Sequence, residues 1–143
     1  MKALIFAAGL GTRLKPLTDT MPKAMVPVQG EPLLAHVLRK LKHAGCKEAV
    51  VNVHHFADQI SDYLATHDFG LSVSISDERD ELLETGGGIK KAAHLLGSSE
   101  PFLVHNVDIL SNLDLAAFYA LHKPERLATL LVSERDTQRY LLF

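Results

Sequence analysis

The residues that follow the first apolar stretch have the types and spacing needed to bind a phosphorylated ligand. Gly9 and Gly11 carry no side chain that would keep a phosphate away from backbone N–H groups. Arg13 adds a planar fork of hydrogen-bond donors, and Lys23 adds a compact positive charge. Two glycines, an arginine and a lysine in one segment therefore predict a loop that holds a polyphosphate.

This loop differs from two common nucleotide-binding motifs. The dinucleotide fingerprint needs a third glycine and then a helix, but Leu14 takes the glycine position and Pro16 interrupts the helix. The acidic residue expected after the second strand is absent from Val53-His54-His55. A P-loop needs Gly-Lys-Ser/Thr, and this chain has Gly11-Thr12-Arg13 instead. We therefore expect a long irregular loop, and we disfavour a nicotinamide-linked oxidoreductase.

A carboxylate, Asp108, stands inside an otherwise mostly apolar run from Phe102 to Leu110. Ligands of open α/β sheets bind beyond the carboxyl ends of the strands, so Asp108 and the glycine loop would meet at one edge. A carboxylate in apolar surroundings needs a cation or hydrogen bonds. Position alone leaves two interpretations equal: a Mg²⁺ ligand, or a turn carboxylate beside Asn112.

Strand and helix patterns alternate along the chain. We predict strands over Lys2 to Ala8, Glu48 to Val53, Leu71 to Ser76, Pro101 to Val107 and Leu127 to Ser133. We predict helices from Glu31-Pro32 to the C-cap Gly45, from Phe56 to His67, from Gly87 to Leu96, and from Leu113 to His122 with Asn112 as N-cap. Short connections between them predict an α/β fold with a Rossmann-like, mostly parallel sheet covered by helices on both faces.

Composition narrows the class of protein. The chain has 143 residues, of which 47% are hydrophobic, so we expect one globular domain. A net charge of −2 argues against a nucleic-acid binder with a broad basic face. No apolar run approaches the roughly 20 residues that span a bilayer, so we expect no membrane partner. The single cysteine, Cys46, and the lack of an export signal favour the reducing cytoplasm.

Taken together, these motifs resemble the signature of sugar-1-phosphate nucleotidyltransferases (nucleotide-sugar pyrophosphorylases). The segments that carry the resemblance are Gly9 to Leu14, Pro16 to Thr18, Met21 to Met25, Glu84 to Gly88, Asn106 to Asp108 and Arg139 to Phe143. The resemblance covers essentially the whole chain. It is greatest to the short bacterial branch with N-acetylmuramate-1-phosphate uridylyltransferases and mannose- or heptose-1-phosphate guanylyltransferases.

The resemblance implies transfer of a nucleoside monophosphate from a nucleoside triphosphate to a sugar 1-phosphate, with Mg²⁺ as cofactor. It implies that Arg13 holds the leaving pyrophosphate, that Lys23 contacts the α-phosphate and the sugar phosphate, and that Asp108 holds Mg²⁺. The nucleotide-binding residues we expect are Ala7, Ala8, Gly9, Gly11, Thr12, Asp77, Thr85 and Gly86. Many larger relatives have Gly-Thr-Ala where this chain has Glu84-Thr85-Gly86, so the base is not predicted.

The end of the chain bears on domain organisation. Tyr140 to Phe143 reads as the start of another strand, and relatives continue for a substantial second half. We therefore expect residues 1–143 to be the N-terminal, nucleotide-binding part of the fold, with the C-terminal sugar-binding part absent. An exposed sheet edge would then favour self-association. A nucleotide-binding module without turnover is the alternative function.

Two further segments contain polar or charged residues near the expected site. Asp77 to Glu81 is a run of charged residues and predicts a solvated loop or a mobile cover over the base pocket. Asn52 and His54 end the second strand and would line the sugar side.

Overall fold

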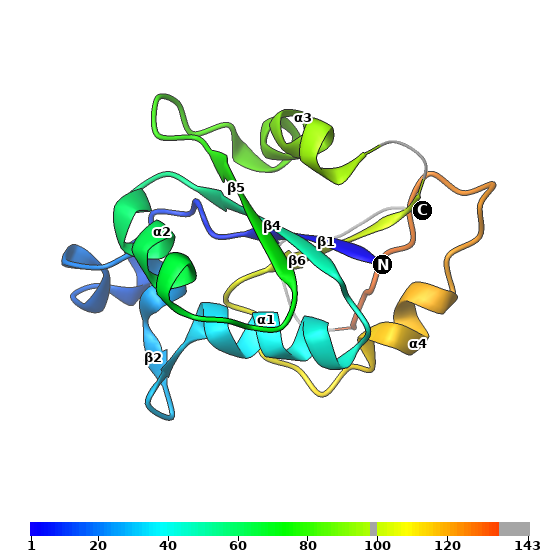
Figure 1. Ribbon diagram of the computed structural model, residues 1–143, viewed down its shortest axis with the longest axis horizontal. Coiled ribbons are helices and arrows are strands. Elements are labelled where there is room, and N and C mark those ends of the chain that lie inside the picture. Colours follow the sequence, from blue (N-terminus) through cyan, green and yellow to red (C-terminus); the bar gives the residue numbers. More distant parts are fainter. Residues whose placement is uncertain (98–99, 135–143) are drawn as a thin grey trace.

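A four-stranded parallel sheet forms the centre of the protein (Figure 1). The structure is a computed structural model that describes residues 1–97 and 100–134. The strands are β1 (Lys2–Phe6), β4 (Glu48–Val53), β5 (Ser72–Asp77) and β6 (Phe102–Asn106). They lie in the order β5-β4-β1-β6, and each neighbouring pair is parallel. The predicted parallel α/β fold is confirmed.

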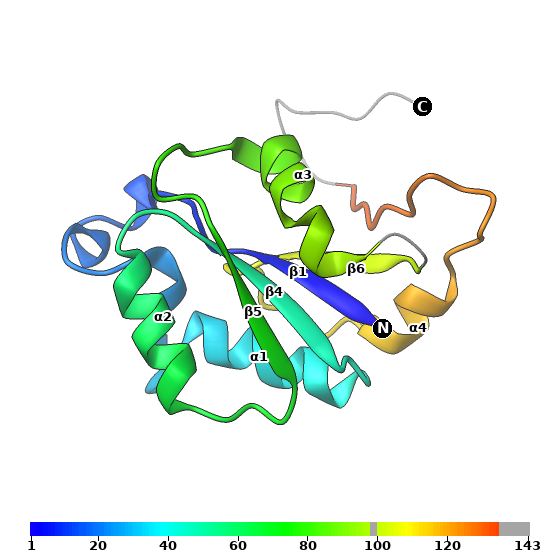
Figure 2. The same cartoon turned by 45° about the horizontal axis from the view of Figure 1, so that its top comes forward.

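Helices cover both faces of this sheet. They are α1 (Leu33–His43), α2 (Ala57–Thr66), α3 (Glu84–Leu96) and α4 (Leu115–Ala120). Figures 1 and 2 show α3 on one face, with α1 and α2 on the opposite face. In the part of the chain that the structure describes, no helix is long and apolar enough to cross a membrane.

Short elements fill the segment between β1 and α1. They are three 3₁₀ turns, η1 (Thr12–Leu14), η2 (Leu17–Asp19) and η3 (Lys23–Met25), and an antiparallel pair, β2 (Pro27–Val28) and β3 (Glu31–Pro32). The segment after β1 is therefore the long irregular loop that the missing third glycine and Pro16 predicted.

The alternation of side chains along the strands divides the core into two clusters. Ala3 and Ile5 pack in the larger cluster with residues of α1, α2 and α4. Leu4 and Val50 point the other way and pack against α3. Phe6 joins this second cluster, so the last side chain of β1 lies on the α3 face, where the site forms.

Three predicted helix ends were wrong. α1 begins at Leu33, because Glu31–Pro32 forms β3. α3 begins at Glu84 instead of Gly87, so its glycines lie within the first turns. α4 is capped by Asp114 instead of Asn112, because the Asp114 side chain accepts a backbone hydrogen bond of 3.0 Å in the first turn.

The strand predicted over Leu127 to Ser133 does not form. Residues 127–133 are neither helix nor strand, and Leu127 is fully exposed. Leu130, Leu131 and Val132 are consecutive and each more than half exposed, so the segment does not present one apolar face to a core. In the described structure, β6 pairs with β1 alone. Strand propensity without a pairing partner and a buried face does not produce a strand. The predicted strand at Tyr140 to Phe143 lies outside the described residues.

We expect acidification to destabilise the fold through His105 of β6. Burial lowers the pKa of this side chain from an ordinary value near 6.5, and the charge of Lys40 lowers it further. The hydrogen bond to the Asn106 carbonyl and the charge of Asp108 act in the opposite direction without cancelling the shift. The folded state therefore binds a proton less readily than the unfolded state, and stability falls as pH drops through about 6.5 toward the lowered pKa.

Thermal unfolding at pH 7.5 and pH 5.5 measures this effect. The wild type should lose more stability between the two pH values than His105→Gln, which has no imidazole to protonate. Equal losses in the two proteins would show that His105 does not contribute.

Candidate active site

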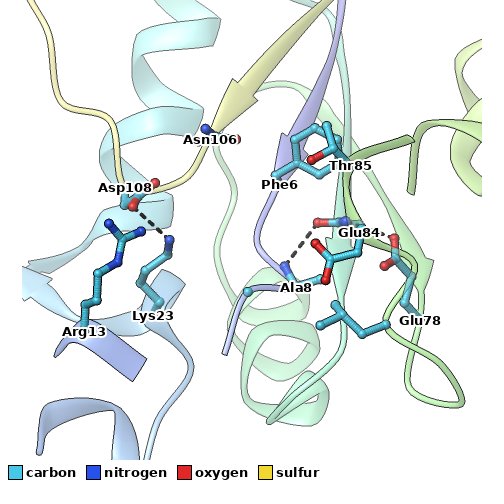
Figure 3. Close-up of a pocket in the computed structure, with 12 residues that line it drawn as sticks. Phe6, Ala8, Arg13, Lys23, Glu78, Glu84, Thr85, Asn106 and Asp108 are labelled. Carbon is cyan, nitrogen blue, oxygen red and sulfur yellow. Dashed lines mark hydrogen bonds and ion pairs between the residues drawn. The ribbon is translucent and has the colours of Figure 1, made fainter. Parts of the chain in front are cut away.

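A pocket of about 350 Å³ opens at the carboxyl ends of β1, β4 and β6 (Figure 3). Figure 3 shows Arg13, Lys23 and Asp108 at one end and Glu84 and Thr85 at the other. Gly9 and Leu82 also line the pocket. Phe6 and Asn106, which are paired at the ends of β1 and β6, also line the pocket. The pocket is thus located where ligands of open α/β sheets bind.

At the first end, residues distant in sequence form a charged cluster. Lys23 Nζ donates a hydrogen bond of 2.8 Å to Asp108 Oδ2, and Arg13 lies beside the same carboxylate (Figure 3). The 3₁₀ turns η1 and η3 position Arg13 and Lys23, and Asp108 follows β6. Gly11 caps η1 with φ 67°, a left-handed conformation that favours glycine. The glycine loop and the end of β6 therefore bring a carboxylate and two cations together.

The charge of Asp108 is favoured by this cluster. Burial by itself would raise the pKa of the carboxyl group. The hydrogen bond and charge of Lys23, with the charge of Arg13, outweigh burial and hold the pKa below its usual value. Asp108 is therefore ionised at neutral pH.

The donor set fits a magnesium ion bound together with a phosphorylated substrate. Among residues 1–97 and 100–134, no three His, Cys, Asp or Glu side chains cluster as metal ligands do. Mg²⁺ is commonly held by one or two carboxylates, water and substrate phosphates, so the one carboxylate beside Arg13 and Lys23 is sufficient. Asp108, whose side chain is 36% exposed, is that carboxylate.

The floor of the pocket contains two polar residues that were not predicted as a pair. Asn52 Oδ1 accepts hydrogen bonds from the backbone N–H groups of Ala7 (2.7 Å) and Ala8 (3.2 Å). Asn52 Nδ2 donates to Glu78 Oε1 at 2.9 Å. Ala7 and Ala8 were expected to bind the nucleotide, and their backbone N–H groups are already bonded within the protein. Glu78 is fully buried, so the prediction of a solvated loop over Asp77 to Glu81 was wrong at this position.

The structure brings most, but not all, of the predicted site residues to the pocket. Those in the lining are Ala8, Gly9, Arg13, Lys23, Thr85 and Asp108. Those in the same segments but outside the lining are Ala7, Gly11, Thr12 and Gly86. Asn52, expected on the sugar side, is in the lining, whereas His54 is not. The ligand contacts assigned to these residues remain predictions.

Asp77 lies away from the pocket. Its carboxylate accepts hydrogen bonds from the backbone and side chain of Arg79, and these bonds lower its pKa. Arg79 also donates to Asp58 of α2 at 2.8 Å. The strand register explains the placement, because Asp77 is paired with Val53, and Val53 packs in the α1–α2 cluster. The assignment of Asp77 to nucleotide binding stays a prediction, and this geometry gives it no support.

Solved structures share this fold. HddC from Yersinia pseudotuberculosis superposes with a TM-score of 0.74 and 33% identity, over 83% of this chain and 52% of that chain. A UDP-glucose pyrophosphorylase complexed with UDP-glucose superposes with a TM-score of 0.69 and 25% identity, over 84% and 52%. The fold and the position of the site define the class: a nucleotide-diphospho-sugar transferase fold.

The family follows from the sequence comparison. The model of the nucleotidyl transferase family matches residues 2–140, and the chain belongs to this family. It is 43% identical to an N-acetylmuramate alpha-1-phosphate uridylyltransferase from Caulobacter vibrioides, over 95% of this chain and 59% of that protein. It is 45% identical to an enzyme of the same name from Neisseria meningitidis serogroup B, over 83% and 52%. The chain thus spans about half the length of these curated relatives.

Proposed function

We propose that the protein transfers a nucleoside monophosphate from a nucleoside triphosphate to a sugar 1-phosphate. The observation that carries this proposal is the convergence of Arg13, Lys23 and Asp108 beside the glycine loop, at the carboxyl edge of the sheet. Both substrates are anions, so a site that joins them needs fixed positive charge. The relatives named as uridylyltransferases support the same reaction.

In this reaction an oxygen of the sugar phosphate attacks the α-phosphorus of the triphosphate. The bond from that phosphorus to the bridging oxygen breaks, and pyrophosphate leaves with the electron pair. Lys23 would hold the α-phosphate and the incoming phosphate, and Arg13 would hold the departing pyrophosphate. Asp108 would hold Mg²⁺, which when bound neutralises charge on the phosphate oxygens. The backbone around Gly9 is open to a phosphate, since a side chain there would point toward Lys23 Nζ, 3.9 Å away.

The proposal also covers which nucleoside triphosphate is the substrate. Uridine and guanosine triphosphates are the first candidates, because the relatives include uridylyltransferases and mannose-1-phosphate guanylyltransferases. We propose that residues 1–143 act as the nucleotide-binding part of such an enzyme. Cytoplasmic location and self-association through a sheet edge remain predictions.

Two measurements on the 143-residue chain test the function. Thermal shifts with UTP, GTP, dTTP, CTP and ATP, with and without Mg²⁺, should show stabilisation by one triphosphate. That stabilisation should depend on Mg²⁺ and be lost in Asp108→Ala. Pyrophosphate release is then measured with the selected triphosphate and N-acetylmuramate, mannose or glucose 1-phosphate.

The outcomes separate the two functions under consideration. Pyrophosphate release that requires a sugar 1-phosphate supports the transferase. A Mg²⁺- and Asp108-dependent thermal shift without release would instead support a nucleotide-binding module. The absence of both would contradict the proposed site.

A further inference from the structure

Glu78, between β5 and α3, is a buried carboxylate without a cationic partner in the described structure. Its exposed fraction is 0%, and no Lys, Arg or His among residues 1–97 and 100–134 forms an ion pair with it. Its oxygens accept hydrogen bonds from Asn52 Nδ2 (2.9 Å) and from the backbone N–H of Leu83 (3.3 Å). Burying a carboxylate is unfavourable, so its presence here points to a task that a neutral side chain would perform less well.

That task is to orient the Asn52 amide. Asn52 is 2% exposed, and its Oδ1 accepts two backbone N–H groups, those of Ala7 and Ala8. With the oxygen directed at the glycine loop, the NH₂ group must face the opposite side and needs an acceptor there. A carboxylate is an acceptor with no competing donor, so it holds the amide in one orientation.

The resulting hydrogen-bond chain joins the two walls of the pocket. It begins at Ala7 and Ala8, at the start of the loop with Arg13 and Lys23, and it ends at Leu83, directly before the wall formed by Glu84 and Thr85. Figure 3 shows Glu78 and Glu84 together at one end of the pocket and Lys23 and Asp108 at the other.

Gly88 of α3 lies directly against this chain. A Cβ at Gly88 would lie 3.0 Å from Glu78 Oε1 and 3.2 Å from Asn52 Nδ2. It would also lie 3.1 Å from Phe6 Cε1, so a side chain at this position requires the polar pair or Phe6 to shift by a few tenths of an ångström. A Cβ at Gly86, two positions earlier in the same helix, would have no neighbour within 4 Å.

We propose that Asn52 and Glu78 are positioning residues that set the separation between the glycine loop and the Glu84–Thr85 wall, and thereby the affinity for the nucleotide. Glu78 lines the pocket floor but has no exposed surface, and both of its carboxylate oxygens accept hydrogen bonds from within the protein, so we assign it an action through Asn52 and Leu83. The ligand part of this inference rests on the proposed function. The hydrogen-bond chain itself does not.

Exchanging the amide and the carboxylate between positions 52 and 78 tests the hydrogen-bond chain. Asn52→Asp alone places two carboxylates in contact, and Glu78→Gln alone places an NH₂ group against either the Asn52 NH₂ or the Leu83 N–H. In the double variant Asn52→Asp/Glu78→Gln, the new carboxylate accepts from Ala7, Ala8 and the new amide. The new amide oxygen then accepts from Leu83, so every hydrogen bond has a donor and an acceptor.

Two readouts are used on these variants, at a temperature where circular dichroism shows each to be folded. The first is the Kd for UTP and for GTP with Mg²⁺ by calorimetry. We expect each single variant to raise the Kd for the triphosphate by roughly tenfold or more, and the double variant to recover most of the lost affinity. The second readout needs no ligand: amide hydrogen exchange at Ala7 and Ala8 should accelerate relative to Ile5 of β1 in the single variants and slow again in the double variant.

A glycine pair provides the second test if a single variant does not fold. Gly88→Ala should accelerate exchange at Ala7 and Ala8, whereas Gly86→Ala should leave it unchanged. The inference is overturned if the double variant is no better than the single variants, or if exchange at Ile5 rises equally with that at Ala7 and Ala8. If wild type binds no triphosphate while the exchange pattern is as expected, the proposed function fails and the hydrogen-bond chain stands.

Discussion

Replacing Lys23 with alanine should lower the rate of nucleotidyl transfer by at least about a hundredfold, the effect typical of losing one group that stabilises transition-state charge. Lys23 Nζ lies 2.8 Å from Asp108, and its side chain is 17% exposed, so a flexible neighbour would not readily replace its charge. The attacking and leaving groups are both anionic, and removing this ammonium leaves their repulsion uncompensated. Pyrophosphate release under saturating triphosphate and sugar 1-phosphate measures the effect.

Lys15→Ala is the matched control, because it removes a lysine from the same loop. The Lys15 side chain is 61% exposed and pairs with Asp19 at 3.1 Å, and exposed pairs of this kind contribute little. The rate of Lys15→Ala should therefore stay close to that of wild type. Undiminished transfer by Lys23→Ala would contradict the proposed mechanism.

Gly11→Ala should destabilise the protein and weaken nucleotide binding together. Its φ of 67° lies in the left-handed region, where a side chain costs roughly 1–2 kcal/mol. A Cβ would also lie 2.8 Å from Thr18 Cγ2 and 3.2 Å from Lys23 Cβ, and overpacking of this kind costs a further ~1–3 kcal/mol. If Lys23 shifts to avoid the new side chain, its ammonium group moves away from the pocket. Urea unfolding and the Kd for the selected triphosphate test both parts.

Gly30→Ala separates backbone strain from crowding. Gly30 has φ 86°, but a Cβ there would have no neighbour within 4 Å. This variant should lose only the part of the stability that comes from the left-handed conformation and should retain nucleotide affinity. Equal losses of affinity in the two variants would show that crowding of Lys23 by a side chain at position 11 does not weaken binding.

For the adjacent residues Asp77 and Glu78, the sequence did not reveal which carboxylate lies at the pocket. Both are acidic and adjacent, and Asp77 was the one assigned to the site. The register of β5 on β4 places Asp77 beside Val53 on the α1–α2 face, whereas Glu78 turns under α3 and bonds to Asn52. Which of two neighbouring carboxylates is buried depends on strand pairing and on a glycine in a later helix, neither of which is a local property of the run.

The sequence by itself determined the layered α/β fold and the charged end of the pocket. Apolar alternation and helical spacing are local signals, and the glycine loop, Lys23 and Asp108 all belong to segments that follow β1 or β6, whose carboxyl ends meet by topology. The tertiary structure alone decided that Leu127 to Ser133 forms no strand, that the Ala7 and Ala8 N–H groups bind Asn52, and that Gly88 admits α3 to the pocket floor. These outcomes depend on pairing partners and on close contacts between segments distant in the chain, which local propensity does not encode.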